Sequence, residues 1–156
     1  MTPFLLLKSL HIVGATVLLG TGAGIAFFML MAHRTGDPKI IAHTAGVVVI
    51  ADLLFTATAV VAQPLTGAGL ATMEGYPLLR GWIAASLALY LIVGLFWLPV
   101  VWMQLRMRDL ARQAVAAGTP LPLLYHRLWR LWFAFGFPAF GAVLAIIWLM
   151  TAKPHF

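Results

Sequence analysis

Residues 40–62 read IIAHTAGVVVIADLLFTATAVVA, a mostly apolar run with one carboxylate, Asp52, near its middle. The run is long enough to cross the hydrocarbon core of a bilayer, which takes about 20 residues of α-helix. A segment in lipid must satisfy its own backbone hydrogen bonds, so a helix is predicted rather than a lone strand. The stretch therefore predicts a transmembrane helix that carries one acidic side chain close to mid-membrane depth.

The composition of the whole chain indicates the same class of protein. Of 156 residues, 63% are hydrophobic and 9% are charged. Soluble domains carry about 25% charged residues, so this chain has too few to cover a soluble surface. Disorder is excluded because it requires low hydrophobicity. The chain has no cysteine, which excludes disulfides, thiolate metal sites and iron–sulfur clusters.

Three further apolar stretches have the length of a membrane span. We therefore expect an all-α fold, a four-helix transmembrane bundle that forms a single integral membrane domain. Glycine and proline residues are frequent between 63 and 77, which predicts a longer loop there. The expected domain is 1–156, and the expected helices lie at about 4–32, 40–62, 78–112 and 123–150.

Basic residues are distributed unevenly between the two sides of the predicted bundle. The side that carries more of them is expected to face the cytoplasm, which places both termini outside. The net charge of +6 is attributed to this topology and to anionic lipid rather than to nucleic acid, because the chain has no dense basic face. The cytoplasmic side holds Arg34, Lys39, Arg106, Arg108, Arg112, Arg127 and Arg130; the other side holds Lys8, Arg80 and Lys153.

Lys8 and His11 lie three residues apart and share one face of the first predicted helix. About two helical turns separate His11 from the outer end, which places it roughly 10 Å deep. Ionisable groups at that depth usually point into the bundle. His11 is therefore a candidate haem ligand or proton-relay imidazole. The alternative is a neutral histidine hydrogen-bonded between helices, with Lys8 reaching the headgroups.

Asp52 begins a predicted polar stripe. Thr56, Ala59 and Gln63 follow at spacings of four, three and four, so they share one helical face that leads from mid-membrane to the outer surface. A buried carboxylate there must pair with a cation, bind one or remain protonated. A salt bridge and a proton or substrate site both remain open. The candidate cations for the salt bridge are Lys8 and Arg80.

The other histidines suggest weaker sites. His43 lies nine residues before Asp52, about 180° round the helix, so the two cannot line one narrow site. His126 and Arg130 share a face at the cytoplasmic entry to the fourth helix. A second haem or anion site and a pair of solvated interfacial residues are the alternatives there. His33 falls in a predicted turn and is given no role.

Small and aromatic residues mark two helix faces. Gly20 and Gly24 form a small-xxx-small pair that permits close approach of another helix, from the same bundle or from a second copy. Besides the lipid bilayer, the possible partners are thus a homo-oligomer through Gly20/Gly24 or a larger membrane complex. One face of the third helix is typical of a bundle core more than of a cofactor wall. It carries Trp82, Ser86, Tyr90, Val93 and Trp97.

Several motifs resemble a known family. KSLHIVG at 8–14, Gly81-Trp82, and WLPVVWMQLRMRDL at 97–110 look like the family called domain of unknown function 2269, predicted bacterial integral membrane proteins. The resemblance covers nearly the whole chain. It implies a multi-pass protein of the bacterial inner membrane, and the family brings no established activity.

A more distant resemblance concerns His11, whose Leu-His-Ile context is similar to the first helix of HemJ-type protoporphyrinogen oxidases and CopD-like four-helix haem proteins. In that group the histidine is implicated in haem binding. The HemJ-type enzymes also carry a Gly-Trp-Leu-His-x-Lys pattern. Gly81 and Trp82 match it, whereas Ala84 and Ser86 stand at the histidine and lysine positions. The resemblance therefore implies a haem pocket more than an oxidase.

Three functions follow as hypotheses. The first is a b-type haem or redox-associated protein with His11 as axial metal ligand and with Lys8, Arg80 and Trp82 in the cofactor site. The second is a scaffold or accessory subunit of a membrane complex. The third is a small transporter subunit whose polar path uses Asp52, Thr56 and Gln63. Whether the chain is an enzyme stays open, and an activity of the chain on its own is the less favoured alternative.

Overall fold

A computed structural model describes residues 2–154, so residues 1, 155 and 156 of the expected domain lie outside the described part. The described chain is helical and forms four continuous helical rods, each long and apolar enough to cross a membrane. They are Pro3–Thr35, Pro38–Met73, Gly81–Ala117 and Leu123–Ala152. The all-α, four-helix prediction is confirmed. The elements are α1 (Pro3–Thr35), α2 (Pro38–Ala51), the π-helical turn η1 (Asp52–Thr56), α3 (Ala57–Met73), α4 (Gly81–Ala117) and α5 (Leu123–Ala152).

Local capping fixes the turn between α1 and α2. α1 ends at Thr35 and is capped by Gly36, whose left-handed φ of 67° costs a glycine little. The Asp37 carboxylate then accepts a hydrogen bond from the Lys39 amide at 2.8 Å, and Pro38 occupies the first position of α2. Proline suits that position because its missing N–H would have no helical partner there.

The loop expected at 63–77 is wrong, because α3 continues to Met73 with Pro64 inside it. Proline removes the N–H that would bond the carbonyl four residues earlier, which belongs to Val60. The Tyr90 hydroxyl of α4 donates a hydrogen bond to that Val60 carbonyl. A side chain from another helix thus satisfies the freed acceptor, as membrane helices with internal proline require. The connection to α4 is correspondingly short, at 74–80.

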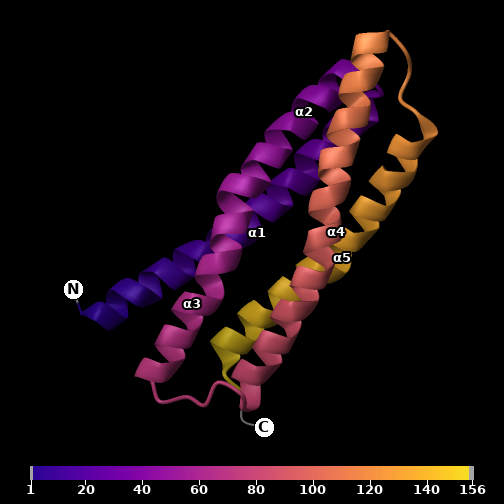
Figure 1. The fold of residues 1–156 in the computed structure, drawn as a ribbon. Helices are drawn as coiled ribbons and strands as arrows, with labels where there is room; N and C mark the ends of the chain where they lie inside the picture. Colours follow the sequence, from indigo (N-terminus) through magenta and orange to yellow (C-terminus); the bar gives the residue numbers. More distant parts are fainter. Residues whose placement is uncertain (1, 155–156) are drawn as a thin grey trace.

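The molecule has two ends that differ in packing (Figure 1). At one end, α2 and the C-terminal half of α1 lie against the C-terminal half of α4 and the N-terminal half of α5. We call this end the packed half. Its core holds Ile25, Met29, Ala32, Ile41, Ala45, Val48, Met103, Met107, Leu110, Ala111, Tyr125, Leu128 and Trp132.

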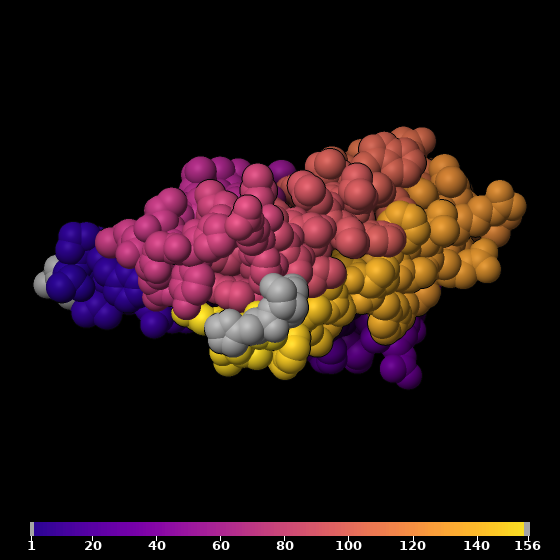
Figure 2. All heavy atoms as spheres, turned by 90° about the horizontal axis from the view of Figure 1, so that it is seen from below, coloured from indigo at the N-terminus to yellow at the C-terminus, as the bar shows by residue number. Residues whose placement is uncertain are grey.

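At the other end, the N-terminal part of α1 pairs with α3 and diverges from α4 and α5 (Figure 1). We call this end the splayed half. Figure 2, which looks at this end, shows the first residues of α1 at one edge of an elongated outline, with α3 beside them. α1 begins and α5 ends at this end of the molecule, as an even number of spans requires.

Candidate functional site

Asp52 lies where the second rod passes from the packed half into the splayed half. It opens η1, in which the Ala57 amide bonds to the Asp52 carbonyl, five residues back instead of four. Single π-helical turns inside α-helices occur frequently at functional sites. The Asp52 side chain is buried, with 4% of its surface exposed. The sequence therefore places an acid inside the bundle at an irregular turn.

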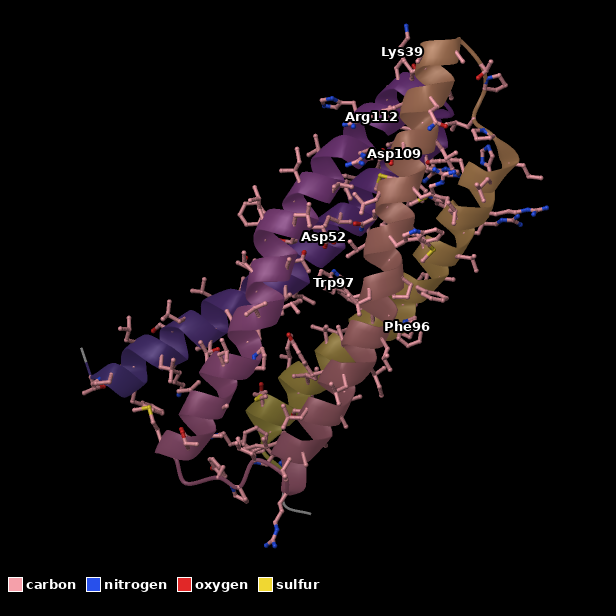
Figure 3. The ribbon with its side chains drawn as sticks, in the orientation of Figure 1. Lys39, Asp52, Phe96, Trp97, Asp109 and Arg112 are labelled. Carbon is pink, nitrogen blue, oxygen red and sulfur yellow. The ribbon has the colours of Figure 1, made fainter. Side chains whose placement is uncertain are left out.

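The Asp52 carboxylate has one weak partner. Trp97 reaches toward it from α4 (Figure 3), and the Trp97 Nε1–H donates to Asp52 Oδ1 at 3.4 Å. The other oxygen, Oδ2, has no hydrogen-bond partner among the described residues. The buried Thr56 hydroxyl, on the next turn, also has none there. Two buried polar groups thus lie close together in sequence with unused hydrogen-bonding capacity.

Of the two alternatives left open for Asp52, the salt bridge to Lys8 or Arg80 does not form among the described residues. The ion pairs in the described part of the chain join Arg108 to Asp109 and Lys153 to Glu74. Helix geometry explains why Lys8 lies far from Asp52. Its neighbour His11 contacts Gln63, which lies eleven residues beyond Asp52, or about 16 Å along the helix axis. Lys8 lies nearly a further turn outward, exposed over the Phe4 ring.

His11 is held against α3 by two hydrogen bonds. Its ring Nδ1 lies 2.8 Å from the Thr66 hydroxyl, and the Gln63 side-chain amide donates to its backbone carbonyl at 2.8 Å. Glycines allow this close approach. A Cβ on Gly14 would lie 2.2 Å from Gln63 Nε2, and a Cβ on Gly67 would lie 3.2 Å from His11 Cε1. The prediction that His11 faces another helix of the bundle is confirmed.

The stripe predicted from spacing is also confirmed as a buried face. Asp52, Thr56, Ala59 and Gln63 have exposed fractions of 4%, 7%, 4% and 9%. Because Gln63 also bonds to His11, the two sites that the sequence suggested separately lie on one line. We call this line the polar column. It consists of Asp52, Thr56, Gln63, Thr66 and His11, and it runs from mid-helix to the splayed end.

Tyr90 is a residue of this region that the sequence reasoning left in the general core. Its hydroxyl donates a hydrogen bond to the carbonyl of Val60, which lies between Thr56 and Gln63 in sequence. Tyr90 thus links α4 to the helix that carries most of the polar column. The available signal was Pro64, whose position predicts a free carbonyl at Val60 once the segment is recognised as helix. Assigning residues 63–77 to a loop hid that signal.

Two of the three residues expected to share a haem site with His11, Arg80 and Trp82, lie elsewhere. Arg80 and Trp82 line a cavity of about 760 Å³ together with Tyr76 and Lys153, and neither Lys8 nor His11 belongs to its lining. Lys153 lies over the Tyr76 ring, 5.1 Å from its centroid, and bonds to Glu74 at 3.0 Å. That hydrogen bond raises the pKa of Lys153 above its usual range.

For haem itself, His11 offers part of what ligation needs. Metal-bound histidines usually have their second ring nitrogen fixed by a hydrogen bond, and Thr66 fixes Nδ1 here. His11 lines neither this cavity nor the one of about 770 Å³ between α1 and α2, however. The described residues also contain no group of three or more histidine and acidic side chains that could hold a metal ion. Haem therefore remains a prediction from the sequence.

The histidines of the packed half form a separate cluster. His33, which was assigned to a turn without a role, lies in the last turn of α1 and stacks on Trp129 with ring centroids 3.8 Å apart. His126 lies beside it, at 5.8 Å. The sequence carried no signal for this cluster, because it depends on α1 meeting α5. His43 is exposed whereas Asp52 is buried, so the prediction that they face different ways is confirmed.

The four spans and the buried side chains define an integral membrane protein. The chain belongs to the family DUF2269, described as predicted integral membrane protein, whose family model matches residues 5–154. No curated protein and no solved structure matches the chain. The family establishes the membrane class, and any finer function rests on the residues themselves.

Proposed function

We propose that the chain takes up and releases a proton at Asp52, as the ionisable site of a small membrane protein that carries protons across the bilayer. The observation that carries the proposal is the state of the Asp52 side chain. It is 4% exposed, lies within a membrane-spanning rod, and has one oxygen without any partner among the described residues. Acidic residues inside membrane helices usually mark proton relays or substrate paths.

The surroundings of Asp52 favour a proton over a structural ion pair. An ionised carboxylate in a low-dielectric site is costly unless a cation or several donors neutralise it. Among the described residues Asp52 has no cationic partner, and the long Trp97 hydrogen bond and the neighbouring Thr56 hydroxyl are too little to balance that cost, so we infer that the neutral acid is the stable form. Ionisation then requires water or a cation to reach the unpartnered Oδ2.

The polar column gives this exchange a direction. Toward the splayed end it offers hydroxyl, amide and imidazole groups, and His11 at its far end is a side chain that gains and loses protons near neutral pH. Toward the packed half, apolar residues such as Met29, Met103 and Met107 fill the core. We therefore assign proton exchange in this conformation to the splayed side, which the basic-residue count places outside the inner membrane of a bacterium.

Proton flux into proteoliposomes tests the proposal. With a potassium diffusion potential and a pH-sensitive dye inside, wild-type protein should acidify the lumen, and Asp52→Asn should abolish this. Asp109→Asn is the matched control because Asp109 lies outside the column, paired with Arg108. Wild-type vesicles without flux, or Asp52→Asn vesicles with undiminished flux, would contradict proton transport.

A second candidate is haem binding at His11, which the fixed orientation of Nδ1 by Thr66 favours. The test is the absorption spectrum, oxidised and dithionite-reduced, of protein purified from a haem-replete host. The haem hypothesis predicts a Soret band and a sharp reduced α band that His11→Ala removes and His43→Ala leaves in place. A colourless wild type would exclude this candidate and leave the Asp52 proposal untouched.

A further inference from the structure

Gln104 of α4 is a buried polar residue of the packed half with unused hydrogen-bonding capacity. It is 3% exposed, and its Oε1 has no hydrogen-bond partner among the described residues. Its helix neighbours Met103 and Met107 belong to the apolar core of this half. An unbonded acceptor in such a core destabilises a protein, whereas an apolar residue of similar size does not. The stability of the fold therefore gives no reason for a glutamine here.

Two contacts show that Gln104 lies on the face of α4 that is turned toward the second rod, Pro38–Met73. Gln104 follows Trp97 by seven residues and precedes Arg112 by eight, so the three share one helix face. Trp97 bonds to Asp52. The Nη2 of Arg112 lies 3.3 Å from where a Cβ on Gly46 of α2 would be. Figure 3 shows Trp97 and Arg112 on this side of α4.

The level of Gln104 is beyond Asp52, away from the polar column. α4 runs from the splayed half to the packed half, so seven residues after Trp97 carry it about 10 Å in that direction. Apolar side chains, among them Val48 of α2 and Met103, fill the core at this level. Apart from aromatic side chains, Gln104 is the buried polar residue that the described chain offers beyond Asp52 in this direction.

The same core contains two buried donors without partners. The indole Nε1–H groups of Trp129 and Trp132 on α5 donate to no described acceptor. Trp132 belongs to the core that contains Met103 and Met107, and Trp129 packs against it. Buried donors and acceptors of this kind are usually bonded by ordered water, and one water serves about three such groups. An acceptor and two donors in one core thus favour a site for bound water beside Gln104.

We infer that Gln104 is a positioning residue for proton transfer on the packed-half side of Asp52, and that it acts through water bound at its Oε1. The inference rests on the proposed function, because it assigns the second half of the proton path. The carboxyl proton of Asp52 passes along hydrogen-bonded water to the water at Gln104 and on to the far side. The carboxylate then takes up the next proton from the splayed side.

The amide itself is not ionised in this step, since its oxygen only accepts a hydrogen bond from the water and orients it. The file of water that joins Asp52 to Gln104 must pass the apolar side chains at the level of Val48. The passage is therefore closed in this conformation, in which Asp52 exchanges protons with the splayed side. Transport requires the two exchanges to alternate, and Gln104 serves the second.

Two substitutions of similar size test the role. Gln104→Met removes both polar atoms and should lower proton flux in the proteoliposome assay by about tenfold or more, as loss of a positioned proton-transfer group does. Its melting temperature should stay equal or rise, because an apolar residue suits the core. Gln104→Glu keeps an oxygen at this position and should retain flux. Gln113→Met is the matched control, since Gln113 is exposed on the same helix.

Deuterium exchange at the Asp52 carboxyl group locates the effect. The carbonyl stretch of a carboxyl group shifts when deuterium replaces its proton, so infrared spectra after transfer to heavy water follow the exchange. Asp52 exchanges with the splayed side directly. Gln104→Met should therefore exchange as fast as the wild type although its flux is lost.

The outcomes separate this inference from the proposed function. Wild-type flux in Gln104→Met, with Asp52→Asn inactive, would overturn the inference alone. Loss of flux and of thermal stability in both Gln104→Met and Gln104→Glu would assign the residue a structural role. Slowed exchange at Asp52 in Gln104→Met would place its effect on the splayed side instead. Wild-type vesicles without flux would overturn the proposed function and the inference together.

Discussion

The packed half and the splayed half use the same helices for different purposes. In the packed half, bulky apolar side chains from α1, α2, α4 and α5 fill one core, and Gln104 is its buried polar residue among those described. In the splayed half, α1 and α3 approach through glycines and are joined by hydrogen bonds. Asp52 stands at the junction. The contrast indicates that one end provides rigidity and the other provides polar groups.

The largest expected effect concerns the packed half. Met29 is 1% exposed, and Met29→Ala should lower the free energy of unfolding by about 3 kcal/mol, because the core cannot close over the lost side chain. Leu10 in the splayed half is 54% exposed, and Leu10→Ala should cost less than about 0.5 kcal/mol. Thermal melts of both variants in the same detergent measure the difference. Equal losses would remove the distinction between the halves.

Gly14 tests whether close approach holds the splayed half together. A Cβ at this position would overlap Gln63 Nε2, so Gly14→Ala should destabilise the protein by about 1.5 kcal/mol, because the Gln63 amide must move and loses its hydrogen bond to the His11 carbonyl. Gly22 has no atom within 4 Å of the corresponding position, and Gly22→Ala should be neutral or slightly stabilising. Melts of the two variants, side by side, decide the point. A harmless Gly14→Ala would show that α1 and α3 are not tightly held.

Tyr90 and Pro64 form a testable pair across α3 and α4. Tyr90→Phe should cost about 1 kcal/mol, since the Val60 carbonyl loses its donor. Pro64→Ala restores a backbone N–H for the same carbonyl, so Tyr90→Phe should cost much less in that background. A double-mutant cycle from unfolding data gives the coupling. Additive losses would mean that the tyrosine does not compensate for the proline.

The smallest effect is expected at the surface of the splayed half. Glu74→Gln removes the ion pair with Lys153 and should cost about 0.5 kcal/mol or less, as exposed pairs do. The pKa of Lys153 is raised, so the contribution is complete below the usual lysine pKa and is lost as the pH rises through the raised value. Melts of wild type and Glu74→Gln should therefore converge at strongly alkaline pH. A difference that persists there would assign the effect to something other than the pair.

Periodicity in the sequence predicted much of this arrangement. The four spans and the buried face through Asp52, Thr56 and Gln63 depend on helix geometry alone, and the structure confirms them. The continuation of α3 through Pro64 depends on Tyr90, a contact from another helix that spacing does not reveal. The salt bridge considered for Asp52 is absent among the described residues for a similar reason. Whether two side chains pair depends on their relative heights along two helices, which the sequence does not reveal.

Other features required the three-dimensional arrangement entirely. The stacking of His33 on Trp129 needs the end of α1 to meet the start of α5. Gly20 and Gly24 line an open space between α1 and α2, whereas the sequence alone allowed these glycines to pack inside the bundle. In both cases the residue types can be read from the sequence, but the residues that become their neighbours in the fold cannot.

The most direct test of the account is the protonation state of Asp52. Infrared spectroscopy of the reconstituted protein resolves the carbonyl stretch of a protonated carboxyl group from the bands of ionised acids. The account predicts such a band at neutral pH in the wild type and in Asp109→Asn, and its loss in Asp52→Asn. A wild type without the band, or an Asp52→Asn spectrum that retains it, would contradict a neutral acid at the centre of the membrane.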